Sequence, residues 1–350
     1  MANEKKATRA AYGETLIELA NAGVPVVAVE ADLSGSTTTK KLGDAYPERL
    51  FNVGIAEQDM VGVAAGLSLT GKVAFTGSFA VFGTGRVYDQ IRNTVCYANL
   101  DVKIAPTHAG VSVGPDGGSH QMVEDIALMR VLPNMRVLVP ADFAAAKAAI
   151  KLAAETPGPV YIRMGRASVP CVYDENSVFE VGRAKVLREG SDVTIVACGV
   201  EIDEALKAAE ALAEKGVSAE VIDAFSIKPL DEETILASAR KTGCVVTAEE
   251  HSVIGGLGGA VAELLSEKLP LPLVRVGMRD CFGTSGEMVS LTLRPSLPLS
   301  MRPYPGKTFC SNANFPLNSA VFDVWSGRME GFAERDEHSV TAAPCARRSC

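Results

Sequence analysis

Short apolar runs rich in β-branched residues alternate with segments of helix length from about residue 8 to residue 163. The runs are VPVVAVEA, KVAFTGSF, VKIAPTHAG, MRVLVPAD and PVYIRMG. Between them, residues 57–69 and 143–154 are rich in alanine and other small residues, which suits helices that pack closely on a sheet. This alternation predicts a parallel sheet with crossover helices.

A second alternation follows in DVTIVACG, SAEVIDAF, GCVVTAEE and LPLVRVG. After the first of these runs, apolar residues recur at helical spacing and make one stripe, namely Ile202, Ala205, Leu206, Ala209, Leu212 and Ala213. We therefore expect an α/β fold of two consecutive domains, residues 1–166 and 183–286, with mainly parallel sheets flanked by helices. Residues 167–182 are interpreted as a linker. Residues 287–350 hold six prolines, eight serines and no lasting period, and are expected to be a disordered tail.

Composition narrows the classes of partner. The chain has 350 residues, of which 47% are apolar and 22% charged, enough for a sizeable core. A net charge of −8 without a long basic run argues against nucleic acid and anionic membranes. No run approaches the roughly 18 apolar residues of a membrane helix, and the start, MANEKKATRA, lacks the apolar core of a signal peptide. We expect a cytoplasmic protein.

Cysteines and histidines offer little for a metal site. Several of the eight cysteines lie in apolar runs, so buried free thiols are expected. The sequence contains four histidines and neither a CxxC nor an HExxH motif. Any metal is therefore expected to come with a ligand or a partner.

Glu57 opens the first of the predicted helices, in NVGIAEQDMVGVAAG, among apolar residues and glycine. One interpretation is a first-turn carboxylate favoured by the helix dipole. The other is functional, because no cation lies nearby in the sequence. A buried carboxylate of that kind could share a proton with a ligand nitrogen.

Two glycine-rich segments follow predicted strands and carry aromatic or polar side chains. GSFAVFGTG contains Phe79 and Phe82, which either cap the sheet edge or present ring faces to a flat ligand. THAGVSVGPDGGSH contains His108, Asp116 and His120. The separation of the two histidines is not a standard metal-ligand spacing, so recognition of a hydroxylated substrate is favoured.

Two arginines end another predicted strand in YIRMGR. Arg163 and Arg166 could hold a phosphate through fork-like donors. They could equally be solvated charges at the sheet edge.

Taken in order, seven segments closely resemble the carboxyl-terminal half of transketolases, and in particular the second subunit of split transketolases. They are EADLSGSTTTKKL, NVGIAEQDM, GSFAVFGTGRVYDQIRN, THAGVSVGPDGGSHQMVEDIALMR, VLVPAD, PVYIRMGR and EEHSVIGGLGGAVAELL. The resemblance spans about residues 7–286. It implies a pyrimidine-binding domain followed by the transketolase C-terminal domain, with thiamine diphosphate lying across a subunit interface.

The resemblance also implies roles for single residues. Glu57 matches the glutamate that bonds the aminopyrimidine ring nitrogen and promotes the imino tautomer, which makes it catalytic. The other matches to the cofactor are Phe82, which stacks on the pyrimidine ring, its neighbour Phe79, and Asp32, an acid near the thiazolium. The matches to the substrate are His108, His120, which is also catalytic, Asp116, which reads hydroxyls, and Ser36 and Arg166 at the phosphate end. The family pattern has a further aromatic residue where Gly85 stands, and Tyr88 is the candidate replacement.

One motif of thiamine enzymes is missing. A GDG followed by a downstream Asn, which the resemblance leads one to expect for the diphosphate and Mg²⁺, does not occur, since GPDGG stands in another context. The resemblance therefore implies an N-terminal transketolase subunit as partner, which would bind Mg²⁺, in a heterotetramer.

The implied activity is transfer of a two-carbon ketol unit from a ketose phosphate to an aldose phosphate. Two alternatives within the fold are a deoxyxylulose-phosphate synthase-like and a 2-oxoacid dehydrogenase beta-like subunit. A third, from another class, is a non-catalytic α/β binding subunit.

Overall fold

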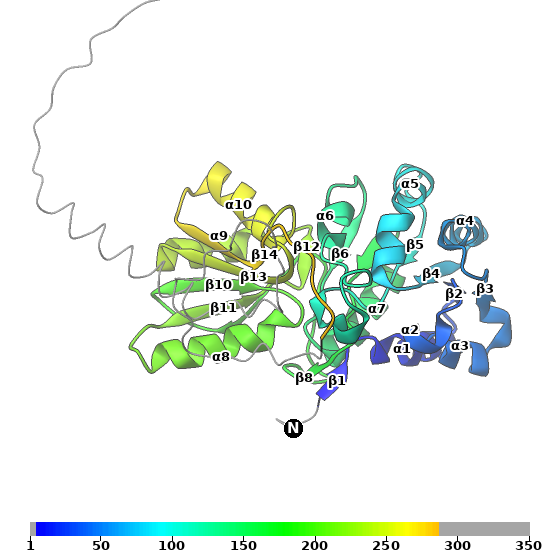
Figure 1. Cartoon of the computed structure of the whole chain (residues 1–350), viewed down its shortest axis with the longest axis horizontal. Helices are drawn as coiled ribbons and strands as arrows, with labels where there is room; N and C mark the ends of the chain where they lie inside the picture. The colour runs from blue at the N-terminus through cyan, green and yellow to red at the C-terminus, as the bar shows by residue number, and fades with distance from the viewer. Residues whose placement is uncertain (1–4, 287–350) are drawn as a thin grey trace, which may run out of the picture.

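The computed structural model describes residues 5–286, and its main feature is a pair of sheets side by side (Figure 1). The first sheet has seven strands in the order β12-β6-β7-β5-β4-β2-β3. These are β2 (Val26–Glu30), β3 (Leu50–Asn52), β4 (Val73–Gly77), β5 (Val102–Ile104), β6 (Arg136–Leu138), β7 (Val160–Ile162) and β12 (Ser226–Lys228). All neighbouring pairs are parallel except β12 with β6. The predicted parallel sheet is confirmed, and β12 joins it from the second half of the chain.

Helices cover both faces of the first sheet because its strands are apolar on both sides. Within β2, Val27 and Val29 pack against α4 and its neighbours, whereas Val26 and Ala28 pack against α1 and α7. Figure 1 shows α4, α5 and α6 on one side of this sheet and α1, α2 and α3 on the other. The helices are α1 (Ala10–Asn21), α2 (Ser34–Thr37), α3 (Lys40–Ala45), α4 (Glu57–Ser68), α5 (Tyr88–Gln90), α6 (Asp125–Arg130) and α7 (Phe143–Glu155).

The second sheet has five strands in the order β14-β13-β10-β11-β9, with only β9 antiparallel. Its elements are β9 (Lys185–Arg188), β10 (Val193–Ala197), α8 (Glu201–Ala213), β11 (Ala219–Asp223), α9 (Glu232–Thr242), β13 (Val245–Ser252), α10 (Leu257–Lys268) and β14 (Leu273–Met278). Of the apolar stripe predicted after the first run, Ile202, Ala205, Ala209 and Leu212 lie on the buried face of α8, whereas Leu206 is half-buried and Ala213 is exposed. Both sheets are mainly parallel and flanked by helices, so the predicted fold class is confirmed.

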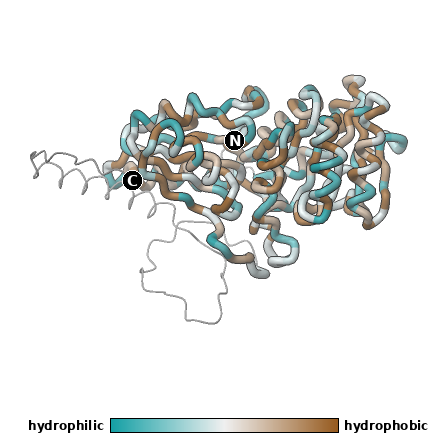
Figure 2. The backbone as a smooth tube through the Cα atoms, turned by 90° about the horizontal axis from the view of Figure 1, so that it is seen from above, coloured by the Kyte–Doolittle hydropathy of each residue, from teal (hydrophilic) through white to brown (hydrophobic). Residues whose placement is uncertain are grey.

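One apolar core runs from the first sheet into the second. It includes Val27 and Ile104 of the first sheet as well as Val196 and Val245 of the second. Figure 2 shows brown, apolar stretches running through the interior of both halves and teal stretches at many outer turns. The two halves therefore pack through buried apolar surface.

Four further expectations concern the linker, the cysteines, membrane-spanning helices and the tail. The segment interpreted as a linker contains β8 (Ser168–Pro170), which pairs with β1 (Lys5–Ala7). Cys96 and Cys198 are buried free thiols as expected, whereas Cys281 is disulfide-bonded. None of the helices between residues 5 and 286 is long and apolar enough to cross a membrane. The tail expected at 287–350 lies outside the described residues.

Candidate active site

The sequence-predicted residues gather at one edge of the first sheet. Asp32 follows β2, Phe79 follows β4, His108 follows β5 and Arg166 follows β7. Because these strands are parallel, their carboxyl ends meet at the same edge, where ligands of open α/β sheets bind. The edge is therefore the candidate active site.

Glu57 is the first residue of α4 and only 3% exposed. The guanidinium of Arg86 donates a hydrogen bond from Nη1 to Glu57 Oε2 at 2.9 Å and lies 4.4 Å above the centre of the Phe82 ring. The expectation that no cation lies near Glu57 is therefore wrong. A π-helical turn, Val81–Arg86, brings Arg86 to it from 29 residues further along the chain.

Arg86 also lies beside Gly85, the position at which the family pattern has a further aromatic residue. Tyr88, the candidate replacement for the missing aromatic residue, packs against the apolar core between the sheet and α4. The surface beside Phe82 is covered by the Arg86 guanidinium instead. Its delocalised plane can stack on an aromatic ring, so a cation–π contact stands where the resemblance led us to expect a ring.

Four rings form a continuous wall, here called the ring wall, made of Phe79, Phe82, His108 and His120. The Phe79 and His108 rings are stacked with centroids 3.8 Å apart, and Phe79 and Phe82 are stacked at 6.3 Å. His120 meets Phe82 edge-on at 5.5 Å. Residues 41 positions apart in sequence thus form one aromatic surface.

The electrostatics of the ring wall keep His108 neutral. Burial, reinforced by the positive charges of Arg9 and Arg166 and by His120, lowers the pKa of His108 to about 3. Its Nδ1 shares a hydrogen bond with the Thr107 hydroxyl at 2.8 Å. A neutral imidazole has one donor and one acceptor nitrogen, and both suit recognition of substrate hydroxyl or carbonyl groups.

Arg9 is a site residue that sequence reasoning missed. Its Nη1 donates to the backbone oxygen of Ser36 at 2.7 Å, and its electrostatic interaction with Arg166 places the two guanidinium groups near each other. Burial and the Arg166 charge lower the pKa of Arg9. A lone arginine ahead of α1 carries no pattern in the sequence, and only folding brings it to Ser36. Two neighbouring cations suit an anionic group.

Glu30 holds the segment that carries Ser36. The hydroxyls of Thr37 and Thr39 both donate to Glu30 Oε1, the former at 2.6 Å. Gly77 packs so closely that a Cβ atom there would lie 1.7 Å from this oxygen. Burial raises the pKa of Glu30. Its fully buried carboxyl group thus fixes residues 34–39 beside Arg9.

Two predicted acids lie at the periphery of this group. Asp32 adopts a positive φ of 63° and exchanges hydrogen bonds with Asn52, both of 3.1 Å. Asp116 is exposed at the end of the turn Val111–Asp116. Within residues 5–286, no direct hydrogen bond joins either carboxylate to the ring wall.

Arg163 does not take part in the candidate active site. It is 7% exposed, and its Nε donates to Asp125 Oδ2 at 2.7 Å in the interior. The interpretation of Arg163 as a phosphate ligand or a solvated edge charge is therefore wrong. Both arginines follow the end of β7, and Arg163 turns inward because the buried Asp125 carboxylate pairs with its guanidinium.

The sheet is mainly parallel with helices on both faces, and its carboxyl edge carries a buried carboxylate, aromatic rings and two arginines. These features define an open α/β protein with a candidate ligand site at that edge. Residues 4–197 match the family model of the transketolase pyrimidine binding domain, and residues 182–293 match that of the transketolase C-terminal domain. The chain belongs to the transketolase family, as its sequence segments indicated.

Relatives of known description support this membership. A protein named as a transketolase C-terminal section from Methanocaldococcus jannaschii is 51% identical over 81% of this chain and 89% of its own length. The 6-deoxy-6-sulfo-D-fructose transketolase subunit of a Clostridium species is 47% identical over 79% of this chain and 86% of its own. A solved split-gene transketolase, an inactive beta4 tetramer, is 56% identical with a TM-score of 0.75, covering 80% of this chain and 91% of that one.

Proposed function

We propose that this chain is the C-terminal subunit of a split transketolase, which transfers a two-carbon ketol unit from a ketose phosphate to an aldose phosphate. The observation that carries the proposal is the buried carboxylate of Glu57 at the carboxyl edge of a parallel sheet, which the Arg86 guanidinium joins to Phe82 of the ring wall. The similarity to a transketolase C-terminal section and to a transketolase subunit supports it.

The residues present fit the ring end of thiamine diphosphate. Glu57 offers a carboxylate with 3% exposure, and the half-buried Phe82 offers a ring face beside it. Phe79 and Asp32 complete the proposed cofactor contacts. Bound thiamine diphosphate supplies the nucleophilic carbon and the electron sink that ketol transfer needs.

Each of the chain's own groups has a distinct proposed task. Glu57 holds a proton shared with a ring nitrogen and can take it or return it, because a carboxylate both accepts and releases protons. For this, Arg86 has to leave Oε2 or turn aside from the Phe82 ring. The Arg86 side chain is 47% exposed, so moving it away from Glu57 and Phe82 leaves the core intact.

Substrate recognition is assigned to the remaining groups. His108, His120 and Asp116 contact hydroxyl groups of the sugar, and His120, edge-on to Phe82, also serves the reaction. Arg9 and Arg166 hold the phosphate together with Ser36, whose backbone oxygen accepts a hydrogen bond from Arg9. Charge-assisted hydrogen bonds of this kind are the strong ones in proteins.

A partner subunit completes the proposed enzyme. Within residues 5–286, no group of three metal-binding side chains is close enough to hold an ion, and we assign Mg²⁺ and the diphosphate to an N-terminal subunit. The description of the solved relative as an inactive beta4 tetramer agrees with a requirement for that subunit. We propose a heterotetramer.

The test is reconstitution of the purified chain with the N-terminal subunit, thiamine diphosphate and Mg²⁺. We expect no ketol transfer by the chain alone and transfer between sugar phosphates after mixing. Glu57→Gln should keep the assembly and lower turnover about 10²- to 10⁴-fold, since an amide keeps the shape but relays no proton.

Asp59→Asn is the matched control, because Asp59 is an exposed acid in the same helical turn. It should retain full turnover. Activity of the chain without a partner would refute the split-subunit proposal. Condensation of pyruvate with an aldose phosphate, in place of ketol transfer, would favour the deoxyxylulose-phosphate synthase-like alternative.

A further inference from the structure

The second half of the chain reaches into the first at the end of β13. Glu250 is 5% exposed, and its Oε1 accepts a short hydrogen bond from the backbone N–H of Ser112. Ser112 belongs to residues 110–117, here called the glycine loop, which follow β5 of the other sheet. A buried carboxylate of one half thus holds the backbone of a loop in the other.

The glycine loop is fitted to this carboxylate. Gly110 has a positive φ of 81°, and a Cβ atom there would lie 2.2 Å from Glu250 Oε2. Only glycine allows both the backbone conformation and the close approach. The N–H of Gly110 donates to the backbone oxygen of Met122 at 2.7 Å, which fixes the start of the loop.

Arg163 orients Glu250 from the opposite side. Its Nη2 donates to the backbone oxygen of Glu250 at 2.9 Å, and its Nη1 lies 3.9 Å from Glu250 Oε2. The same guanidinium is held by Asp125. Because its charge is paired with Asp125, the Arg163 guanidinium is held in place and can in turn fix the position of Glu250.

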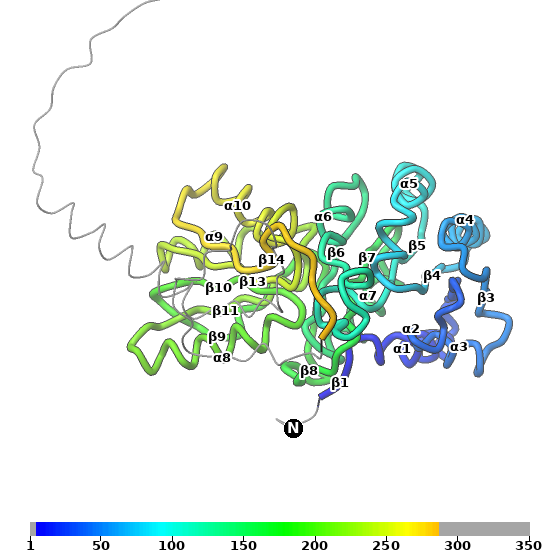
Figure 3. The backbone as a smooth tube through the Cα atoms, viewed as in Figure 1, coloured from blue at the N-terminus to red at the C-terminus, as the bar shows by residue number. Residues whose placement is uncertain are grey.

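The glycine loop contains one proposed substrate residue, Asp116, and a second one, His120, follows it closely in sequence. Its own sequence gives it little stiffness, because Gly114 and Gly117 also have positive φ. Figure 3 shows the orange segment after β14 running past this region, where Gln121 donates to the backbone oxygen of Thr284 at 3.2 Å. Gln121 lies just beyond the loop and also donates to the backbone oxygens of Val111 and Gly114, at 3.2 and 3.3 Å. The second half of the chain therefore contacts the loop directly through Glu250 and indirectly through Gln121.

We propose that Glu250 is a positioning residue for substrate binding: through the N–H of Ser112 it holds the glycine loop in the conformation that presents Asp116 and His120 to the sugar. The inference rests on the proposed function for the identity of the substrate. It assigns to the second half of the chain an indirect part in substrate recognition, although that half contributes no side chain to the ring wall.

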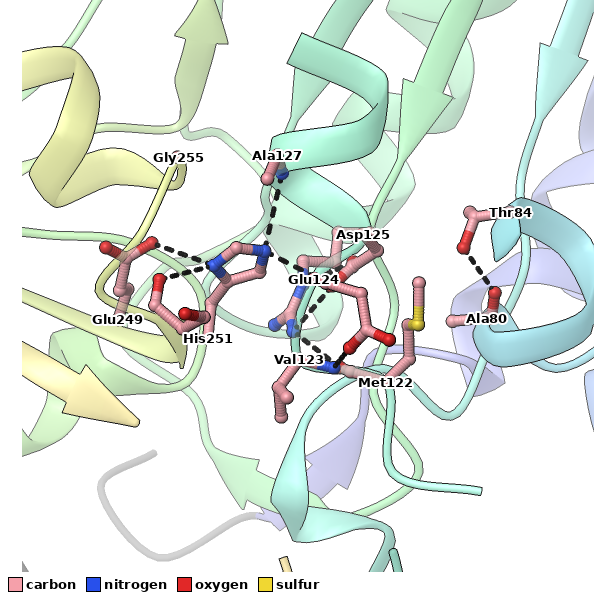
Figure 4. Close-up of polar contacts among 12 residues, drawn as sticks. Ala80, Thr84, Met122, Val123, Glu124, Asp125, Ala127, Glu249, His251 and Gly255 are labelled. Carbon is pink, nitrogen blue, oxygen red and sulfur yellow. Dashed lines mark hydrogen bonds and ion pairs between the residues drawn. The ribbon is translucent and has the colours of Figure 1, made fainter. Parts of the chain in front are cut away.

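The neighbouring acid has a different task. Glu249 accepts hydrogen bonds from the N–H groups of Leu257 and Gly258 at 2.7 and 2.8 Å, where α10 begins. Figure 4 shows the His251 ring between the Glu249 carboxylate on one side and Ala127 and Asp125 on the other. Glu249, in β13, therefore stabilises the start of α10 and makes a matched control for Glu250.

The experiment compares Glu250→Ala, Glu250→Gln and Glu249→Ala in the reconstituted two-subunit enzyme and in the isolated full chain. In the enzyme, Glu250→Ala should raise the KM of the sugar phosphate about 10- to 100-fold, the worth of a hydrogen bond to a charged group, with a smaller loss of kcat. Glu250→Gln should recover part of the loss, because the amide oxygen still accepts from Ser112. Glu249→Ala should change KM less than about twofold while lowering thermal stability.

Hydrogen exchange at the amides of residues 111–117 supplies a readout that needs no activity. These amides should exchange faster in Glu250→Ala than in the parent chain and should be unchanged in Glu249→Ala. Unchanged exchange in Glu250→Ala, or equal KM changes in Glu250→Ala and Glu249→Ala, would overturn the inference. A parent enzyme without ketol transfer would count against the proposed function alone, since the exchange comparison still decides whether Glu250 holds the loop.

Discussion

A buried carboxylate and a half-exposed guanidinium share the surface where the proposed cofactor ring would lie. The Glu57 carboxylate is only 3% exposed and therefore needs a hydrogen-bond partner within the protein. The Arg86 guanidinium provides one at 2.9 Å. The same guanidinium gains a cation–π contact with Phe82. At the scale of single residues, the chain thus protects its proposed cofactor surface with a side chain that can be displaced.

Removing this partner should destabilise the chain. Arg86→Ala is expected to lower the free energy of unfolding by about 1 to 2 kcal/mol at pH 7, because it leaves the Glu57 carboxylate buried without a cation. Urea unfolding of the isolated chain measures the effect. In the Glu57→Gln background the cost should largely disappear.

Arg92→Ala is the control, since Arg92 is an exposed arginine of the same segment and should matter by less than about 0.5 kcal/mol. An equal cost of Arg86→Ala with and without Glu57 would show that the ion pair contributes nothing.

His108 should make the chain sensitive to acid. Burial lowers its pKa in the folded chain to about 3, against roughly 6.5 in the unfolded chain. The unfolded chain therefore binds a proton first as the pH falls, and stability is lost between about pH 6.5 and pH 3. Compared with His108→Asn, the parent chain should lose more unfolding free energy between pH 7 and pH 5. Parallel losses in both proteins would contradict the prediction.

At the scale of elements, β11 ends on a buried acid, Asp223. Burial raises its pKa, whereas burial lowers the pKa of His108. Burial raises the pKa of Asp223 to about 7, although the Tyr173 hydroxyl donates to its Oδ2 at 2.6 Å. Among residues 5–286, its Oδ1 finds no hydrogen-bond partner. The strand therefore ends on a carboxyl group that favours the protonated form.

The replacement Asp223→Asn should stabilise the chain at alkaline pH. The unfolded chain loses the proton near pH 4 and the folded chain near pH 7, so the parent loses stability as the pH rises between these values. The asparagine variant should gain on the parent over this interval in urea unfolding. Asp89→Asn, an exposed aspartate, should show no such gain. A constant difference between parent and Asp223→Asn across pH 4 to 8 would be the contrary result.

At the scale of the whole molecule, a buried ionic network joins the two halves. Arg163, which follows β7, contacts Asp125, the first residue of α6, and the backbone of Glu250 in β13. Tyr161 donates to the same Asp125 carboxylate at 2.5 Å. Together with the continuous apolar core, this network holds both halves in one arrangement around the glycine loop.

Breaking the network should be costly. Arg163→Leu is expected to destabilise the chain by about 3 to 5 kcal/mol, because the Asp125 charge stays buried without its cation. Arg136→Leu serves as control, since Arg136 is half-buried and donates to the backbone oxygen of Pro157, and it should cost far less. Thermal and urea unfolding measure both variants. Similar costs for the two arginines would mean that the network contributes no more than an edge contact.

Much of the architecture follows from local pattern. Strands such as β2 and β4 are short β-branched runs with both faces apolar, and α8 carries a single apolar stripe, so period and composition were enough to predict them. The family segments likewise identified the residues of the ring wall. Strand β12 and the short β1–β8 pair were not predicted, because their residues, SIK, KKA and SVP, form no apolar run that the pattern could reveal.

By itself, the sequence determined the fold class, the family and the identity of most candidate site residues, because these depend on periodicity and on motifs of neighbouring residues. Only the tertiary structure decided that Arg86 lies on Glu57, that Arg9 joins the site and that Arg163 and Glu250 are buried between the halves. Such contacts join residues 27 to 87 positions apart. Their partners are chosen by the packing of whole sheets, and a linear pattern of residue types does not record which charged groups that packing brings together.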